Sequence, residues 1–301
     1  MMKRRVIAHF LALVTVAIWG STFVFTKMLL MSGLSPAQIF TLRFIIAYML
    51  LLVLELTLRR QSFRLLCVSW RDELIMLFLG ISGGSLYFLT ENAAMLYTTA
   101  TNTSLIVCSC PLFAMLLVAL VYGRREVFTR VQIVGSLLAC LGMAVVVLNG
   151  HFVLHVSPVG DLLAFVACLC WAVYSLLMKW VADRYSTFLI TRKVFFYGLL
   201  TMLPYYLVFP GFPTMEVILG SQVIWNLLFL SVVASMVCFL VWNWVIGELG
   251  TVVATNWVYF NPITTILFAW WLLDERITPW FLLGTVFILV GMYLCDKKQK
   301  R

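Results

Sequence analysis

The chain has 301 residues, of which 63% are hydrophobic and only 11% are charged, and its formal net charge is +9. So few charges cannot cover the surface of a soluble globular domain, which excludes a soluble enzyme or a soluble binding module. The composition instead places the protein in a lipid bilayer, where about 20 apolar residues in a helix cross the hydrocarbon core.

Ten apolar stretches of about 18 to 25 residues follow one another along the chain, each with a length suited to a membrane-spanning helix. They cover residues 6–30, 37–58, 74–95, 98–121, 129–149, 159–181, 188–209, 222–246, 251–273 and 279–296. The first stretch follows three basic residues, but it is longer than the apolar region of a signal peptide, so we interpret it as a retained helix. The connections are short. We therefore predict an all-α polytopic membrane protein with ten transmembrane helices and no soluble domain.

The basic residues predict the orientation of the chain in the membrane. With the N-terminus in the cytoplasm, eighteen of the 21 Lys and Arg residues fall in cytoplasmic segments. Only Arg276 falls in an outer connection, while Lys27 and Arg43 lie within helices. The positive-inside rule therefore predicts that both termini are cytoplasmic. The positive charge then reflects topology, and we expect no nucleic-acid partner.

Histidines and cysteines are too dispersed to predict a metal centre. His151 and His155 lie four residues apart in one connection, with no third ligand near them in the sequence. The cysteines lie almost entirely in apolar stretches, where small packing residues are expected. No P-loop or other nucleotide-binding motif occurs. We therefore expect neither a metal ion nor another cofactor, and we do not expect an ATP-driven pump.

The second half of the sequence repeats the first. The aligned pairs, at offsets of 149 to 152 residues, are Trp19 with Trp171, Lys27 with Lys179, Asn92 with Asn243, Pro111 with Pro262, and Glu126 with Glu275. Because each half holds five stretches, the second half enters the membrane from the opposite side. We therefore predict two inverted five-helix repeats, residues 1–150 and 151–301, with a substrate site near the midplane between them.

Three segments of the sequence carry a resemblance to a known family. They are the Trp-Gly-Ser of the first stretch, "LYFLTENAAMLYTTATNTSLIVCSCPLF" in the third and fourth, and "ATNWVYFNPITTILFAWWLLDERIT" in the ninth. They resemble the EamA-type branch of the drug/metabolite transporter superfamily along nearly the whole chain. The first half reads "YGRREVFT" where that family usually has a Gly-Glu pair, so Glu126 departs from the pattern more than Glu275 does. The resemblance implies an inner-membrane carrier that moves small organic metabolites, often amino acids, by alternating access.

Two prolines predict an irregular backbone in the middle of the fourth and ninth helices. Pro111 and Pro262 lie near the middle of their stretches, and each lacks the N–H group that would bond the carbonyl four residues earlier. The carbonyls of Val107 and Val258 are then free, which hydrocarbon tolerates only next to protein or a water-filled cavity. We interpret each proline as a kink, a bend that offers an acceptor to substrate, or both.

The remaining candidate cavity residues are polar or aromatic, and helical spacing gathers several of them around the prolines. Such a cavity suits a substrate with an apolar or aromatic body. The alternative for each aromatic residue is a place facing lipid or at the membrane interface. The candidates are Trp19, Tyr87, Asn92, Ser104, Trp171, Tyr174, Asn243, Thr255, Trp257 and Tyr259.

Three charges share one layer in the outer part of the membrane. Glu91 lies ~25 Å along the third helix, Lys27 lies at a similar height, and Arg43 lies ~9 Å from the outer side. Burying an unpaired carboxylate at this depth costs on the order of several kcal/mol, so Glu91 is expected to have a partner. We hypothesise that Glu91 pairs with Arg43 or Lys27 and that Asn92 completes the hydrogen bonding. A permanent structural pair, an outer gate and a proton-coupling site all remain open.

The repeat bears on the role of Glu91. The second half has Trp242 at the position of Glu91 but keeps the asparagine, as Asn243. A purely fold-setting role would be expected in both halves, so this asymmetry favours a functional role for the carboxylate.

Glycines recur seven residues apart in both halves, as Gly135 with Gly142 and Gly284 with Gly291. This spacing is typical of close helix packing. A dimer face is the alternative, so both a monomer and a homodimer remain open.

We predict a multi-pass secondary transporter of the bacterial inner membrane, and not an enzyme. It is expected to export small metabolites, namely amino acids or aromatic and amphipathic compounds, by alternating access. A flippase for a lipid-linked substrate is the alternative. A membrane enzyme would need convergent His, Ser or carboxylate groups, which the sequence does not offer.

Overall fold

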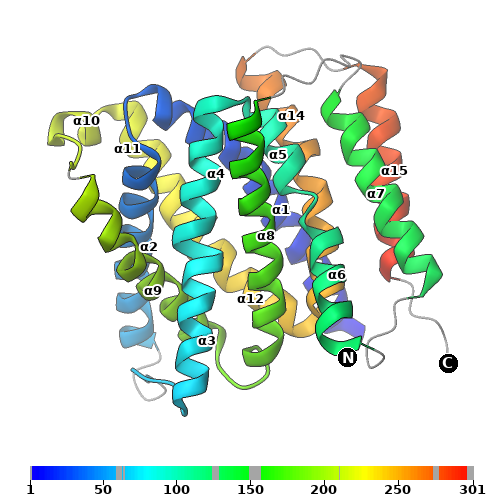
Figure 1. Ribbon diagram of the computed structural model, residues 1–301, viewed down its shortest axis with the longest axis horizontal. Helices are drawn as coiled ribbons and strands as arrows, with labels where there is room; N and C mark the ends of the chain where they lie inside the picture. Colours follow the sequence, from blue (N-terminus) through cyan, green and yellow to red (C-terminus); the bar gives the residue numbers. More distant parts are fainter. Residues whose placement is uncertain are drawn as a thin grey trace.

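The protein is an all-helical bundle. The computed structural model describes residues 2–58, 63, 65–123, 129–148, 157–209, 211–273 and 278–296, and no strand occurs among them. Most helices run along a common direction, and Figure 1 shows them from one side. The predicted all-α fold is therefore confirmed.

The helices follow the predicted apolar stretches in chain order. The first half contains α1 (Met2–Met31), α2 (Pro36–Leu58), α3 (Trp70–Gly80), α4 (Leu86–Tyr97), α5 (Ala100–Val107), α6 (Cys110–Tyr122) and α7 (Arg130–Leu148). The second half contains α8 (Pro158–Val181), α9 (Thr187–Val208), α10 (Met215–Leu219), α11 (Ser221–Leu228), α12 (Cys238–Leu249), α13 (Thr251–Asn256), α14 (Asn261–Leu273) and α15 (Pro279–Asp296).

Three of the junctions between helices continue the helical path with a different pitch. α3 joins α4 through Ile81–Ser85, where the backbone kinks at Gly84 (φ −129°, ψ −105°), and a π-helical turn, Phe229–Val237, joins α11 to α12. A 3₁₀ turn, Trp257–Phe260, joins α13 to α14. Such turns alter the regular hydrogen-bond ladder and are common at functional sites.

The helices are apolar enough for a membrane. In the described parts of the chain, six helical segments are long and apolar enough to cross a bilayer, and Arg130–Val145 and Pro279–Cys295 are shorter apolar helices. α9 is not among them and carries the charges of Arg192 and Lys193 near its start. The protein is therefore a multi-pass membrane protein, and the number of ten crossings stays a prediction.

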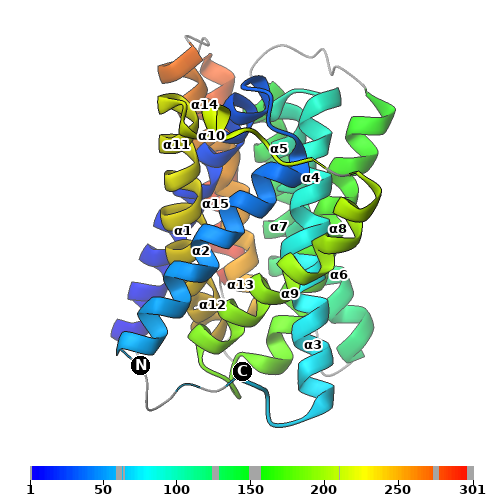
Figure 2. The same cartoon turned by 90° about the vertical axis from the view of Figure 1, so that its left-hand side faces the viewer.

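The two ends of the bundle are distinct. α1 begins and α15 ends at the same end, which is the lower end in Figures 1 and 2. We call this the terminal end of the bundle and the other the opposite end. The terminal end also holds the last turn of α2 and the first turn of α3 (Figure 2). That it faces the cytoplasm stays a prediction.

Short polar side chains define where helices begin. Ser35 and Gln38 form a reciprocal pair at the start of α2, since the Gln38 N–H donates to Ser35 Oγ and the Ser35 N–H to Gln38 Oε1. Ser157 and Ser186 accept from backbone N–H groups in the first turns of α8 and α9. These contacts satisfy donors that would otherwise be unpaired at the helix start.

The glycines that recur at seven residues pack α7 against α15. A Cβ atom on Gly291 would lie 2.5 Å from Gly135 O and from Ala139 N, and one on Gly142 would lie 2.6 Å from Gly284 O. The two backbones therefore touch where the glycines face each other. The glycine-containing faces of α7 and α15 thus pack against each other within one chain, as the interpretation of close helix packing predicts.

Replacing Gly291 by alanine is expected to destabilise the protein, because the methyl group would overlap backbone atoms of α7 that cannot rotate away. Overpacking of this kind costs about 1 to 3 kcal/mol. Gly247→Ala is the matched control, since no atom outside its own helix lies within 4 Å of its added Cβ. The control should be neutral or slightly stabilising. Unfolding in mixed detergent micelles measures both variants, and equal stabilities would contradict the packing.

Two buried ion pairs join α9 to the first half at the terminal end. Arg192 Nε lies 2.7 Å from Glu55 Oε2, and both side chains are only 3% exposed. Lys193 Nζ contacts Glu73 Oε1, which also accepts a 2.5 Å hydrogen bond from Tyr197 OH. Since removing one member of such a pair leaves a buried charge, this end of the α2–α9 contact is tightly held.

A neutral contact joins the same two helices at the opposite end. Tyr206 OH of α9 donates to Thr41 Oγ1 of α2 over 2.9 Å. At the repeat offset of 151 residues, Thr41 corresponds to Arg192 and Glu55 to Tyr206. The two contacts are thus equivalent by the sequence repeat, but one is an ion pair and the other a hydroxyl contact.

Candidate functional site

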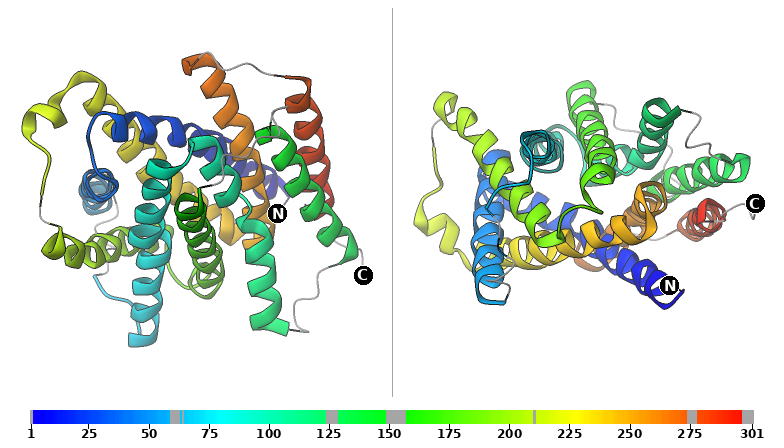
Figure 3. Two further views of the ribbon diagram at one scale, coloured as in Figure 1. Left: turned by 45° about the horizontal axis from the view of Figure 1, so that its top comes forward. Right: turned by 90° about the horizontal axis from the view of Figure 1, so that it is seen from below.

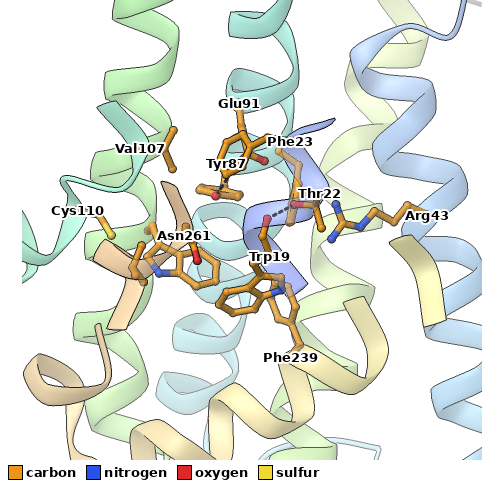
Figure 4. Close-up of a pocket in the computed structure, with 13 residues that line it drawn as sticks. Trp19, Thr22, Phe23, Arg43, Tyr87, Glu91, Val107, Cys110, Phe239 and Asn261 are labelled. Atoms are coloured by element: carbon orange, nitrogen blue, oxygen red, sulfur yellow. Dashed lines mark hydrogen bonds between the residues drawn. The ribbon is translucent and has the colours of Figure 1, made fainter. Parts of the chain in front are cut away.

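A small cavity lies inside the bundle between its two ends (Figure 4). Its volume is about 30 Å³, which is room for only a few water molecules. The lining residues are Trp19, Thr22, Phe23, Arg43, Tyr87, Phe88, Glu91, Val107, Cys110, Trp171, Phe239, Val258 and Asn261. They come from α1, α2, α4, α5, α6, α8, α12, α14 and the turn before α14, so both halves of the chain build the cavity.

Aromatic rings form most of its wall. The rings of Trp19 and Trp171 meet edge to face with centroids 5.2 Å apart, and Phe239 lies 5.8 Å from Trp19. Tyr87 lies 5.1 Å from Trp171 on the other side. Offset and edge-to-face contacts of this kind hold the rings in fixed orientations. The wall is therefore rigid and apolar.

The π-helical turn Phe229–Val237 anchors two of the lining side chains. Trp19 Nε1 donates to Ala234 O over 2.9 Å. Arg43 Nε donates to Leu230 O over 3.1 Å and to Ser235 Oγ over 2.5 Å. The backbone hydrogen bonds of a π-helical turn differ from those of a regular α-helix. Trp19 Nε1 and Arg43 Nε both donate to oxygens of this turn.

A cation and an anion face this cavity from neighbouring helices (Figure 4). Glu91 Oε1 accepts a 2.8 Å hydrogen bond from Tyr87 OH one turn earlier. The Arg43 guanidinium lies over the Phe88 ring, 4.7 Å from its centroid. Both side chains are buried. The cavity therefore offers a guanidinium and a carboxyl group within a largely apolar wall.

In the structure, Glu91 and Lys27 do not have the partners that were predicted for them. In the described part of the chain, Glu91 forms no ion pair within 4.0 Å of Arg43 or Lys27. Lys27 Nζ instead donates to Met95 O over 2.6 Å, outside the cavity lining. Glu91 accepts instead from the Tyr87 hydroxyl, one helical turn earlier in α4.

Asn92 and Asn243 bind the framework and not the cavity. Asn92 Nδ2 donates to Pro36 O in the first turn of α2 over 3.3 Å. Asn243 Nδ2 donates to Thr191 Oγ1 near the start of α9 over 2.9 Å, and its Oδ1 accepts from Tyr174 OH over 2.5 Å. The asparagine shared by the two halves thus holds the second helix of each half. Its predicted hydrogen bond to Glu91 is not formed.

Five other candidates also lie outside the lining of this cavity. Tyr259 OH pairs with Ser136 of α7 over 3.0 Å, and Trp257 Nε1 donates to His9 Nδ1 of α1 over 3.2 Å. Thr255 Oγ1 bonds to a carbonyl of its own helix. Ser104 is buried in α5. Tyr174, the fifth, stacks behind Trp171 with centroids 5.1 Å apart.

The helical path is irregular just before each of the two prolines. Pro111 lies in the first turn of α6, which follows a turn at Cys108 and Ser109, and Pro262 lies in the first turn of α14, which follows the 3₁₀ turn Trp257–Phe260. A proline fits the first turn, where its missing N–H has no partner to lose. The preceding turns carry Val107 and Val258, and both of these side chains line the cavity.

Much of the lining consists of residues that the repeat relates to one another. At offsets of 151 or 152 residues the pairs are Trp19 with Trp171, Phe88 with Phe239, Val107 with Val258, and Cys110 with Asn261. Arg43, Tyr87 and Glu91 come from the first half alone, where the second has Val194, Cys238 and Trp242 at an offset of 151. The apolar wall is thus shared by both halves, and the charges are not.

Sequence reasoning missed six lining residues, namely Thr22, Phe23, Phe88, Cys110, Phe239 and Asn261. Phe88 and Phe239 align with each other at the repeat offset, which was a usable signal. Five residues named from the sequence lie outside the described residues, namely Glu126, His151, His155, Glu275 and Arg276.

Comparison with known proteins gives the family. The model of the EamA-like transporter family matches the chain twice, over residues 6–148 and 158–295. The chain belongs to the EamA-like transporter family. This agrees with the resemblance to EamA-type members of the drug/metabolite transporter superfamily.

Relatives of this EamA-like transporter match it over most of its length. It is 29% identical to an uncharacterised transporter of Archaeoglobus fulgidus, over 97% of this chain and 98% of the relative. It is 27% identical to a probable amino-acid metabolite efflux pump of Escherichia coli, over 94% and 93%. It is 25% identical to a probable terminal-alkyne amino-acid exporter of Streptantibioticus cattleyicolor, over 76% and 74%.

One solved crystal structure shares the fold of the EamA-like transporter. Its TM-score is 0.73 with 17% sequence identity, and the match covers 96% of each chain. At this identity the likeness concerns the fold alone.

Proposed function

We propose that this EamA-like transporter exports small zwitterionic metabolites, amino acids or aromatic relatives of them, by alternating access across the bacterial inner membrane. Its two halves, residues 1–150 and 151–301, act as inverted five-helix repeats with both termini in the cytoplasm. The observation that carries the proposal is the cavity with Arg43 and Glu91 set in an aromatic wall.

The charges suit a molecule that carries both a carboxylate and an ammonium group. Arg43 would bind the carboxylate, since a guanidinium matches its planar geometry. Glu91, oriented by Tyr87, would bind the ammonium group. The rings of Trp19 and Phe239 would then contact an apolar or aromatic side chain. The names of the Escherichia coli and Streptantibioticus relatives point to the same substrate class.

The size of the cavity supports alternating access. About 30 Å³ is too little for an amino acid, so the helices around it must separate before substrate enters. Carriers built from inverted repeats achieve this by rocking one half against the other around a central site. The wall residues that correspond at the repeat offset fit such a movement.

Counterflow in proteoliposomes tests the proposal. Vesicles loaded with unlabelled phenylalanine should accumulate labelled phenylalanine or leucine, and vesicles without protein should not. The matched competitors are 3-phenylpropionate, which lacks the ammonium group, and 2-phenylethylamine, which lacks the carboxylate. Each should compete at least about tenfold more weakly than phenylalanine, because one buried charge is left without its partner.

Two outcomes would contradict this proposal. Equal competition by all three compounds would mean that the charges do not select a zwitterion. Counterflow of none of the compounds would reject an amino-acid substrate and would favour lipid-linked substrates, which can be tested in the same vesicles.

A further inference from the structure

A second cavity lies at the edge of the bundle, near the terminal end. Its volume is about 240 Å³, and it is lined by His9, Val253, Asn256, Trp257, Leu289, Met292, Tyr293 and Cys295. These residues come from α1, from α13 with the turn that follows it, and from α15. Viewed from below, α15 and the start of α1 lie beside each other at the edge of the bundle (Figure 3). We call this the lateral cavity.

Asn256 is a buried polar residue of the lateral cavity. It is 3% exposed, and among the described residues neither its Nδ2 nor its Oδ1 has a hydrogen-bond partner. By contrast, the neighbouring Trp257 Nε1 is bonded to His9 Nδ1. Burying an amide without partners in a hydrocarbon environment is costly. The sequence repeat does not account for an asparagine at position 256, because the corresponding residue of the first half is Leu105.

The surroundings of Asn256 define what the cavity accepts. Most of the wall is apolar, from Val253, Leu289 and Met292. An amide offers one donor and one acceptor together, so the complementary group carries both as well, as a hydroxyl or a primary amide does. Among the described residues, those that line the cavity include no Lys, Arg, Asp or Glu.

The depth of the lateral cavity suits an amphiphile in the membrane. His9 lies about 10 Å along α1 from its start, and Met292 about 6 Å from the end of α15. On the outer side Leu289 is 48% and Tyr293 65% exposed, as residues facing lipid are. The cavity is thus reached from the acyl-chain region close to one membrane surface.

We infer that the lateral cavity is a binding site for an uncharged amphiphile. Its apolar chain lies against α1 and α15, and its hydroxyl or amide group bonds to Asn256 once that side chain, whose amide atoms are buried, turns toward the occupant. Such a molecule comes either from the membrane, as a monoacylglycerol does, or from the cell as an amphipathic metabolite. Trp257 precedes Val258, which lines the central cavity, so an occupant of the lateral site contacts the segment that separates the two cavities.

Photolabelling of the full-length protein in liposomes tests the site. The probe is octanol carrying a diazirine group, and mass spectrometry locates the label. Saturable labelling is expected on peptides that contain Met292 and Tyr293, with competition by octanol and octanamide but not by octane or octyl sulfate. Asn256→Leu should weaken saturable labelling about tenfold, the loss expected for two neutral hydrogen bonds.

The controls separate this site from general lipid exposure. Asn226→Leu removes another buried asparagine, whose Nδ2 also lacks a partner, and should leave labelling unchanged. Leu289→Trp fills the mouth from a lipid-facing position and should reduce labelling even if Asn256→Leu folds poorly. Competition by monoacylglycerol would assign the site to membrane lipid, and competition by amphipathic metabolite amides to a soluble source. Equal competition by octane, or labelling unaffected by both cavity variants, would overturn the inference.

Discussion

Replacing Arg192 by methionine is expected to lower the free energy of unfolding by about 3 to 5 kcal/mol. The substitution keeps most of the apolar stem but leaves the Glu55 carboxylate, 3% exposed, without its partner at 2.7 Å. An unpaired charge in a low-dielectric interior is among the costliest defects that a substitution creates. Unfolding of the purified protein in dodecyl maltoside micelles with increasing SDS measures the change.

Two controls give this result its meaning. Glu55→Gln combined with Arg192→Met removes both charges and should recover a large part of the loss. Arg4→Gln removes one partner of a pair at the surface, where Arg4 is 76% exposed and lies 3.6 Å from Glu248, and should cost less than about 1 kcal/mol. An Arg192→Met protein as stable as the wild type would show that the buried pair does not hold α2 against α9.

Replacing Glu91 by glutamine is expected to reduce counterflow of a zwitterionic substrate between about tenfold and about a hundredfold, the range for one hydrogen bond to a charged group. Glutamine keeps the size of the side chain and can still accept from Tyr87 OH, so the cavity wall should stay in place. The loss should appear mainly in KM. If Glu91 also carries a coupled proton, the response of uptake to an imposed pH gradient should disappear with it.

The matched variant is Tyr87→Phe, which keeps the ring against Trp171 and removes only the hydroxyl that orients Glu91. Its effect should be smaller, up to about tenfold. Unchanged transport, pH response and protein yield in Glu91→Gln would reject a role of this carboxylate in gating, coupling and substrate binding alike.

Most of the helical layout could be predicted because each helix buries its own backbone polar groups and shows apolar side chains to lipid. The stretch 37–58 and α2, Pro36–Leu58, differ by one residue at the start. The turns inside the helical paths were harder to predict. The turn Ile81–Ser85 contains Gly83 and Gly84, but Phe229–Val237 has no glycine or proline to announce it. Its geometry depends on the side chains that pack on it, above all Trp19 and Arg43.

Some of the residues that line the cavity could be predicted from aromatic pairs that align in the sequence repeat. Trp19 and Trp171 were selected as an aligned pair, and both line the cavity. Asn92 and Asn243 were also an aligned pair, yet they hold helices together. Helical spacing tells which residues share a face, but not whether that face meets a cavity or a neighbouring helix. The partner of Glu91 depended on the Tyr87 rotamer, which a sequence does not specify.

The unequal contacts between α2 and α9 bear on the kinetics of a carrier that opens its two ends in turn. In the proposed alternating access, opening the terminal end would separate Arg192 from Glu55, while opening the opposite end would separate neutral contacts, Tyr206 with Thr41 and Gln38 with Gly211. The empty carrier should therefore rest with its terminal end closed and should show different half-saturation concentrations from the two sides of the membrane. Such an asymmetry cannot create a gradient, because both directions share the same transition states. The asymmetry instead sets the substrate concentration at which transport from each side reaches half of its maximal rate.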